Sequence, residues 1–158
     1  MKSYHKHTLK MMDKMNIKYF IGADSLIGLS ENDIYKYSQN LKIYMYEYNS
    51  VKIMIFFLLL LKKKIILKPK LDNKKLLFKL RYKPTFLSKD KTWIKIFILK
   101  KINQKYYVSI GNKNTCFSSK DINISKQNIN GNNLNIPSEI NNFISKYKDE
   151  LLSNFYKN

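Results

Sequence analysis

The residues of this sequence that best suit chemistry lie between Gly22 and Tyr48. Gly22-Ala23-Asp24-Ser25 is a run of small residues that predicts a turn, where a phosphate group can approach the backbone amides closely. Leu41–Tyr48 predicts a strand downstream of this turn. A strand that carried two carboxylates beside such a turn would hold the divalent ion of a phosphoryl or nucleotidyl transfer reaction. The order of elements therefore favours the skeleton of a nucleotidyltransferase site.

Five residues are candidates for binding a nucleotide or a phosphate group: Gly22, Ala23, Asp24 and Ser25 from the turn and Lys42 from the strand. A lysine at this place would offset phosphate charge directly, so the site would bind its ligand without a divalent ion and would not turn it over. In the other interpretation, which we favour slightly, Lys42 points to solvent from a degenerate, empty cleft.

Asp24 and Asn40 are the candidate metal ligands, and magnesium is the ion expected if the protein is active. Lys42 would repel a cation, so a site with two carboxylates is not expected on this strand. Asp24 has an alternative role that we favour, in which its carboxylate accepts hydrogen bonds from the backbone amides of its own turn. Glu31 and Asp33 are expected on a solvated loop. No catalytic residue is assigned.

Two strands and a helix would position these residues. Ile17–Ile21 is β-branched and aromatic and predicts a strand, which we expect to be a neighbour of Leu41–Tyr48. Thr8–Met15 has apolar residues at helical spacing and predicts a helix before the first strand. Alternation along the second strand places Leu41, Ile43 and Met45 on one face and Lys42, Tyr44 and Tyr46 on the other.

At these residues the sequence resembles the LicD/fukutin family of glycan phosphotransferases. That family has a helix, a strand ending in Gly-Gly-Ser/Thr-Leu-Leu-Gly, and then a Trp-Asp-Asp-Asp-Ile-Asp-Ile strand. Leu9–Asn16 corresponds to the end of the helix, Ala23–Gly28 to the first motif and Tyr37–Ile43 to the second, whose aspartates are all replaced here. Asn135-Ile136-Pro137, followed by a helix with Phe143 and Tyr147, is similar to the end of the LicD domain.

The resemblance implies a nucleotidyltransferase-like fold, a CDP-type donor and a surface glycan as acceptor. Because the acidic motif is missing, it also implies a protein that is degenerate in catalysis. The alternative function is a non-catalytic basic binding protein, such as a component of a ribonucleoprotein particle that reuses the fold. A third interpretation is an accessory subunit of a glycan pathway at a membrane surface.

The charge of the chain is strongly positive. The 158 residues carry a formal net charge of +19, which indicates nonspecific binding to polyanions such as nucleic acid or anionic membranes. A bias toward A/T-rich codons would also enrich lysine. Arg81 is the only arginine, which disfavours sequence-specific reading of bases. Lys79, Arg81 and Lys83 alternate along the predicted strand Leu76–Lys83 and form either a solvated face or a basic, phosphate-binding wall.

One apolar stretch could interact with a membrane. Val51–Leu61 is far below the roughly 20 residues that a spanning helix needs, so we expect no transmembrane segment. We expect a buried core helix there, with contact to a membrane surface as the alternative. The first residues lack the apolar core of a secretory signal, and Cys116 is the only cysteine. The expected location is the cytoplasm, with a membrane-peripheral position as the alternative.

The remaining patterns predict an α+β fold in a single domain spanning residues 1–158: a mixed sheet with an N-terminal, a central buried and a C-terminal helix. Ile65–Leu67 predicts a short strand ended by Lys68-Pro69-Lys70, and Trp93–Leu99 and Tyr106–Ile110 predict a hairpin. Thr115–Asn135 is expected to be irregular, with a turn at Gly131-Asn132-Asn133. Pro137-Ser138-Glu139 marks the start of a helix whose apolar stripe extends to Phe155. His5 and His7 are expected in a frayed terminus.

Overall fold

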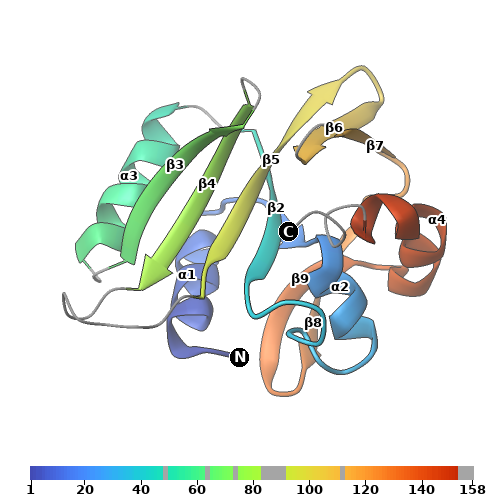
Figure 1. Ribbon diagram of the computed structural model, residues 1–158, viewed down its shortest axis with the longest axis horizontal. Coiled ribbons are helices and arrows are strands. Elements are labelled where there is room, and N and C mark those ends of the chain that lie inside the picture. Colours follow the sequence, from blue (N-terminus) through green and yellow to red (C-terminus); the bar gives the residue numbers. More distant parts are fainter. Residues whose placement is uncertain (48–49, 63–64, 73–74, 83–91, 111–112, 153–158) are drawn as a thin grey trace.

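The computed structural model describes residues 1–47, 50–62, 65–72, 75–82, 92–110 and 113–152. In these residues four helices accompany a curled mixed sheet, which confirms the α+β class (Figure 1). The helices are α1 (Ser3–Lys14), α2 (Ala23–Ser30), α3 (Ser50–Lys62) and α4 (Ile140–Leu152).

The main sheet has seven strands. Five of them lie in the order β1 (Tyr19–Ile21), β2 (Leu41–Tyr46), β5 (Ile94–Ile102), β4 (Lys75–Tyr82) and β3 (Ile65–Asp72). Strand β2 is parallel to β5, and the other neighbours in this order are antiparallel. The far end of β5 continues into β6 (Lys105–Ile110), which pairs with β7 (Lys113–Ser118). The predicted pairing of the first two strands is therefore confirmed, with Phe20 opposite Tyr44.

Both faces of β2 are buried, for different reasons. Its residues Leu41, Ile43 and Met45 contribute to the apolar face that α1 and α3 cover, together with Ile94 and Ile96 of β5. In Figure 1, α1 and α3 lie behind β3, β4 and β5, and no helix lies over the side of these three strands that faces the viewer. On the opposite face of β2 an aromatic cluster fills the space toward α4. Its members are Phe20, Tyr44, Phe97, Phe117, Phe143 and Tyr147.

Residues Ala23–Ser25 form the first turn of α2, so the predicted small-residue turn is wrong. Gly22 is extended, and Ala23 adopts a positive φ of 50° before the helix continues. The eight-residue helix is short, but Leu26, Ile27 and Leu29 are all buried. Tertiary packing of this apolar face stabilises a helix that local propensity disfavours.

Two predictions about strands are wrong. Strand β3 does not end at Lys68 but continues through Pro69 to Asp72, which is possible because β3 is the edge strand of the order and needs no amide donor on its outer side. The segment 115–135 is largely ordered in β7 and in a separate hairpin, β8 (Ile124–Ile129) and β9 (Asn132–Pro137). Its turn is at Asn130 and Gly131, which both have positive φ, one residue before the expected position.

The terminal helices agree with the sequence patterns in part. Helix α4 begins at Ile140 as expected, whereas Phe155 lies outside the described residues. Helix α1 begins at Ser3, earlier than expected, and buries His5 completely, so the prediction of a frayed terminus is wrong. The predicted hairpin of β5 and β6 is confirmed, with Asn103 at positive φ in its turn.

Helix α3 is not the buried core helix that its composition predicts. Phe56 and Leu60 are buried against the sheet, but Met54 and Leu58 on the outer side are more than half exposed. No helix among the described residues is both long and apolar enough to cross a bilayer.

Candidate functional site

The start of α2 is fastened to β2, and this brings the candidate phosphate-binding residues together. The amide of Gly22 donates a hydrogen bond to the carbonyl oxygen of Lys42 at 3.0 Å. The hydroxyl of Ser25 accepts a hydrogen bond from the amide of Lys42, also at 3.0 Å. The end of β1, the first turn of α2 and the start of β2 are thus one connected unit.

Asp24 and Lys42 form a buried ion pair between the carboxylate Oδ2 and the ammonium Nζ. Their side chains are only 2% and 7% exposed. The expectation that Asp24 binds its own backbone amides is therefore wrong, and so is the alternative in which Lys42 points to solvent. Asp24 also lies in the first turn of α2, where the helix dipole favours a negative charge.

Ser25 and Asn40 have structural partners within the same unit. The Ser25 hydroxyl is 3.4 Å from the carbonyl oxygen of Asn40, and the side-chain oxygen of Asn40 accepts a hydrogen bond from the amide of Trp93 at 2.8 Å. The second bond links the approach to β2 with the start of β5. The amide oxygen of Asn40, a candidate metal ligand, is thus already engaged.

The backbone of Gly22 is covered by an aromatic side chain. A Cβ atom at this glycine would overlap the ring of Tyr44, which is fully buried. Burial raises the pKa of Tyr44, and the nearby Asp24 carboxylate raises it further. The Tyr44 phenol is therefore neutral at any physiological pH, and its ring fills one side of the space beside Gly22.

The residues of this unit do not fit a magnesium ion. Mg²⁺ prefers an octahedral set of oxygen ligands, whereas the Asp24 carboxylate is neutralised by Lys42 and the Asn40 oxygen is hydrogen bonded. Oδ1 of Asp24 is buried without a hydrogen-bond partner among the described atoms, but a single carboxylate oxygen is far short of this set. Within the described ranges no three His, Cys, Asp or Glu side chains gather closely enough to hold a metal ion.

Lysines occupy one register position across four adjacent strands, and we call this set the lysine row. Lys42 of β2 is opposite Lys95 of β5, Lys95 is opposite Lys79 of β4, and Lys79 is opposite Lys68 of β3. Residues in register share a face of the sheet. Lys79 and Lys95 are half-buried, whereas their neighbours Leu80, Ile94 and Ile96 are fully buried on the other face. The row thus runs from the Asp24–Lys42 pair across the face opposite α1 and α3.

The lysine row differs from the expected basic wall. Lys79 is half-buried on β4, whereas the side chain of Arg81 and the whole of Lys83 lie outside the described part of the chain, so the predicted wall is not tested there. Lys95 and Trp93 were not among the residues predicted for the site. The alternation Trp93, Lys95, Phe97 is a signal for a strand face with a basic residue, but its register opposite Lys42 is not visible in the sequence.

A polar cluster from distant parts of the chain supports the start of β5. The hydroxyls of Tyr4 and Thr92 are 2.6 Å apart, and Nζ of Lys2 donates to Thr92 at 3.0 Å. Nδ1 of His5 is 2.6 Å from the hydroxyl of Tyr35. Helix α1 thereby holds both the loop before β2 and the residue before Trp93.

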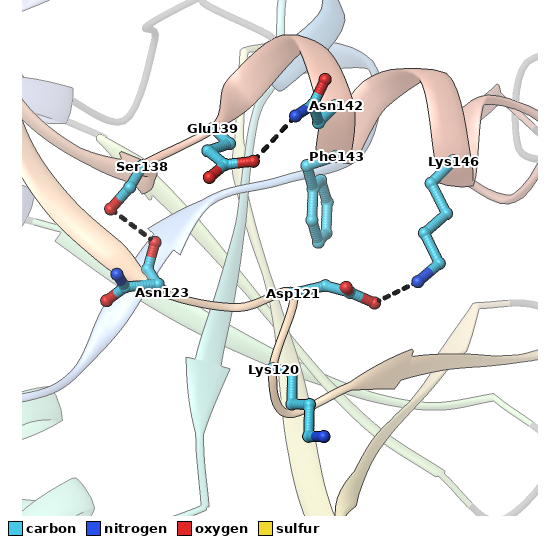
Figure 2. A pocket seen from close by; sticks show the side chains of 8 residues that line it. All are labelled: Lys120, Asp121, Asn123, Ser138, Glu139, Asn142, Phe143 and Lys146. Carbon is cyan, nitrogen blue, oxygen red and sulfur yellow. Dashed lines mark hydrogen bonds and ion pairs between the residues drawn. The ribbon is translucent and has the colours of Figure 1, made fainter.

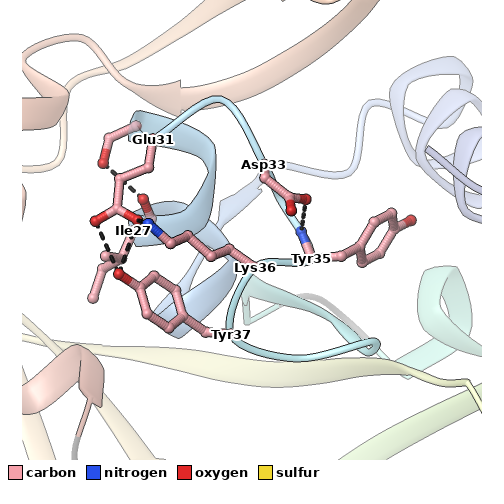
Figure 3. A network of polar contacts seen from close by, with 7 residues as sticks. Ile27, Glu31, Asp33, Tyr35, Lys36 and Tyr37 are labelled. Carbon is pink, nitrogen blue, oxygen red and sulfur yellow. Dashed lines mark hydrogen bonds and ion pairs between the residues drawn. The ribbon is translucent and has the colours of Figure 1, made fainter.

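Two surface networks lie outside this unit. Figure 3 shows Glu31 pairing with Lys36 and accepting hydrogen bonds from Tyr37, and these two contacts lower the pKa of the Glu31 carboxyl. The Asp33 carboxylate accepts the amide of Tyr35 at 2.9 Å. Both acidic residues are exposed, in agreement with the expected solvated loop.

A hollow of about 200 Å³ lies beside the start of α4 (Figure 2). Its polar groups are paired with one another: Lys146 with Asp121, Asn142 with Glu139, and Ser138 with the carbonyl of Asn123. Tyr147 also donates a hydrogen bond to Asp121. These pairs join α4 to the segment between β7 and β8, so we assign the network a structural role.

No protein-family model matches the sequence, and no curated protein matches it either.

Proposed function

We propose that the protein is a nucleotidyltransferase-like domain of the LicD/fukutin type that binds a phosphate-bearing ligand and does not transfer it. The observation that carries the proposal is the buried ion pair of Asp24 with Lys42. Both residues stand where this chain departs from the family's pattern: Asp24 replaces a glycine, and Lys42 replaces an aspartate. The two departures contact each other, so each supplies the charge that the other requires.

Loss of catalysis follows from this exchange. Transfer from a CDP-type donor would need a divalent ion to neutralise the phosphates in the transition state. A buried ammonium in place of a metal-binding carboxylate repels that ion. Because this ammonium is paired with Asp24, it neither holds the ion nor bridges the attacking and leaving groups.

Binding is supported by the rest of the lysine row. Lys95 and Lys79 follow Lys42 on the same face of the sheet, and both residues are half-buried. Lysines at one register position gather positive charge on one face of the sheet, and this charge attracts an anion. A diphosphate, as in a CDP-type donor, or a phosphorylated glycan has the charge and size to contact two adjacent lysines.

The second candidate function is binding of single-stranded RNA, as in a ribonucleoprotein component. Trp93 favours it, because an aromatic ring two residues before Lys95 could stack a base while the lysines contact phosphates. The net charge of +19 supports the same interpretation. The two candidate functions differ in the length of ligand that they require: a nucleotide or diphosphate is sufficient for the first, whereas the second requires an oligonucleotide.

The test is calorimetric titration of the protein with CDP, pyrophosphate and an oligouridylate, each with EDTA and with magnesium. We expect CDP or pyrophosphate to bind equally well in EDTA, because lysines rather than a metal hold the phosphates. Lys95→Glu should weaken binding by about tenfold or more, since it removes one charge-assisted contact and adds a repulsion. The fluorescence of Trp93, the only tryptophan, reports whether the ligand is near the row.

Lys105→Glu is the matched control, because Lys105 is exposed at the start of β6 and the substitution changes the net charge equally. An equal loss of binding affinity in Lys95→Glu and Lys105→Glu would indicate only general electrostatic attraction and would contradict the proposed site. A strict requirement for magnesium in the wild type would contradict loss of the metal site. Binding of the oligouridylate alone would favour the RNA function.

A further inference from the structure

Helix α3 presents an apolar stripe to the outside of the molecule. We call this stripe the outer face of α3. Its members recur at the spacing of one helix face, and their exposed fractions lie between 45% and 57%. They are Val51, Met54, Ile55, Leu58 and Leu61. Leu59, at 37%, borders the stripe.

The outer face is held rigidly in place. Phe56, Phe57 and Leu60 on the inner side are buried, and α3 packs against β3 and α1. In Figure 1 the helix lies at the outer margin of the molecule, beside the edge strand β3. The exposed side chains therefore belong to a folded helix whose inner side is already packed against the rest of the protein.

The concentration of exposed apolar side chains on α3 is unlike the rest of the described chain. Among the described residues, the only other large hydrophobic side chain with comparable exposure is Ile102, at 47%, on β5. Single exposed apolar residues are ordinary, but a contiguous group indicates an interaction surface.

Charge identifies the kind of partner. Helix α3 contains no acidic residue, and it carries Lys52 in its first turn and Lys62 at its end. In the sequence Lys62 is followed directly by Lys63 and Lys64. With a net charge of +19 on the whole chain, this surface is complementary to an anionic one.

The side-chain types favour lipid over protein. Protein interfaces are enriched in Trp, Tyr and Arg at their centres, and the outer face has none of these. Leucines with lysines beside them are typical of helices that lie in a bilayer interface. A helix of 13 residues is about 20 Å long, which is too short to span the hydrocarbon core but sufficient to lie flat upon it.

We propose that α3 docks the protein on an anionic phospholipid bilayer. The helix lies parallel to the membrane plane, with Met54 and Leu58 inserted at the boundary of headgroups and acyl chains. Lys52 and Lys62 contact the anionic headgroups. This inference does not depend on the ligand-binding proposal, because α3 covers the opposite side of the sheet from the lysine row.

The test is co-sedimentation of the full chain with vesicles of phosphatidylcholine containing 30% phosphatidylglycerol (about one third anionic lipid). We expect the protein to bind these vesicles, and to bind vesicles of pure phosphatidylcholine far more weakly. Leu58→Glu and Met54→Glu should each lower the partition coefficient by about tenfold or more, because each removes apolar area and adds a repelled charge. Lys62→Glu should lower it by about fivefold or more and reduce its salt dependence.

Ile102→Glu is the matched control, because it makes the same kind of change at an equally exposed apolar residue on another element. We expect its binding to equal that of the wild type. Thermal unfolding of each variant checks that the exposed substitutions leave the fold intact. Equal binding by Leu58→Glu and wild type would overturn the proposal. A concentration-dependent dimer that Leu58→Glu dissociates, without vesicle binding by the wild type, would also overturn it.

Discussion

At the scale of single residues, the Asp24–Lys42 pair has the largest energetic consequence. Removing one partner of a buried ion pair leaves an uncompensated charge in the protein interior. We expect Lys42→Met or Asp24→Asn to lower the free energy of unfolding by about 3–5 kcal/mol. The double variant Asp24→Asn with Lys42→Met should lose much less free energy of unfolding than the two single variants lose together, because no charge remains buried. Urea unfolding of the four proteins measures the coupling.

The exposed pair of Lys36 with Glu31 provides the comparison. Its side chains are 50% and 36% exposed, so solvent screens the interaction. We expect Glu31→Gln to change stability far less than Asp24→Asn does. If the single variants at Asp24 and Lys42 changed the free energy of unfolding as little as Glu31→Gln does, the Asp24–Lys42 pair would be solvated in solution.

Asp121 predicts a dependence of stability on pH. Hydrogen bonds from Lys146 and Tyr147 hold the pKa of its carboxyl below the ordinary value of 3.8. A carboxyl whose pKa is depressed by folding stabilises the protein above its unfolded pKa, and the contribution is lost as the pH falls through the folded pKa. Asp121→Asn should therefore be less stable than the wild type at pH 6, and the difference should narrow below about pH 4. Urea unfolding at pH 6 and pH 3 tests this, and a difference that is independent of pH would contradict it.

At the scale of elements, α2 depends on the absence of a side chain at Gly28. A Cβ atom there would overlap the carbonyl oxygen of Asp33, because the chain folds back over the end of the helix and the amide of Asp33 bonds to the Gly28 carbonyl at 2.8 Å. We expect Gly28→Ala to lower the free energy of unfolding by about 1–3 kcal/mol, since the backbone at Asp33 must move to make room and no flexible side chain can move instead. The midpoint of urea unfolding measures this cost.

Gly131 is the matched control for this prediction. It has a positive φ of 71° but open space around it, and Asn is tolerated in that conformation. Gly131→Asn should be nearly neutral. If Gly28→Ala were equally neutral, the return of the chain over α2 would be looser in solution than the structure indicates.

At the scale of the whole molecule, the sequence predicted the elements whose patterns are strong. The first two strands, the hairpin of β5 with β6 and the start of α4 all have clear periodicity. Helix α2 was mistaken for a turn because small residues at 22–25 carry the same local signal in both structures, and only the buried contacts of Leu26 and Leu29 decide between them. The hairpin of β8 with β9 was missed because its asparagines disfavour strands, although Leu134 and Ile136 alternate as buried residues.

The geometry of the site depended on contacts that no local pattern contains. Asp24 meets Lys42 across 18 residues, and Lys42 meets Lys95 through the register of a parallel pair. Register follows from the packing of both sheet faces, so the lysine row could be found only in the folded chain. The exposure of α3 was equally invisible, because a helix apolar on every side predicts burial wherever a second layer exists to cover it.

Edge strand β3 has a consequence for the way that copies of this protein meet in a concentrated solution. A free sheet edge invites strand-to-strand polymerisation, to which a chain rich in isoleucine, phenylalanine and asparagine is prone. Pro69, opposite Phe78 of β4, has no amide hydrogen to donate to a neighbouring strand. An incoming strand therefore meets an interruption in the middle of β3, with a lysine on either side of it in the sequence. The residue that suggested the end of a strand is thus of the type that opposes the addition of further strands at a sheet edge.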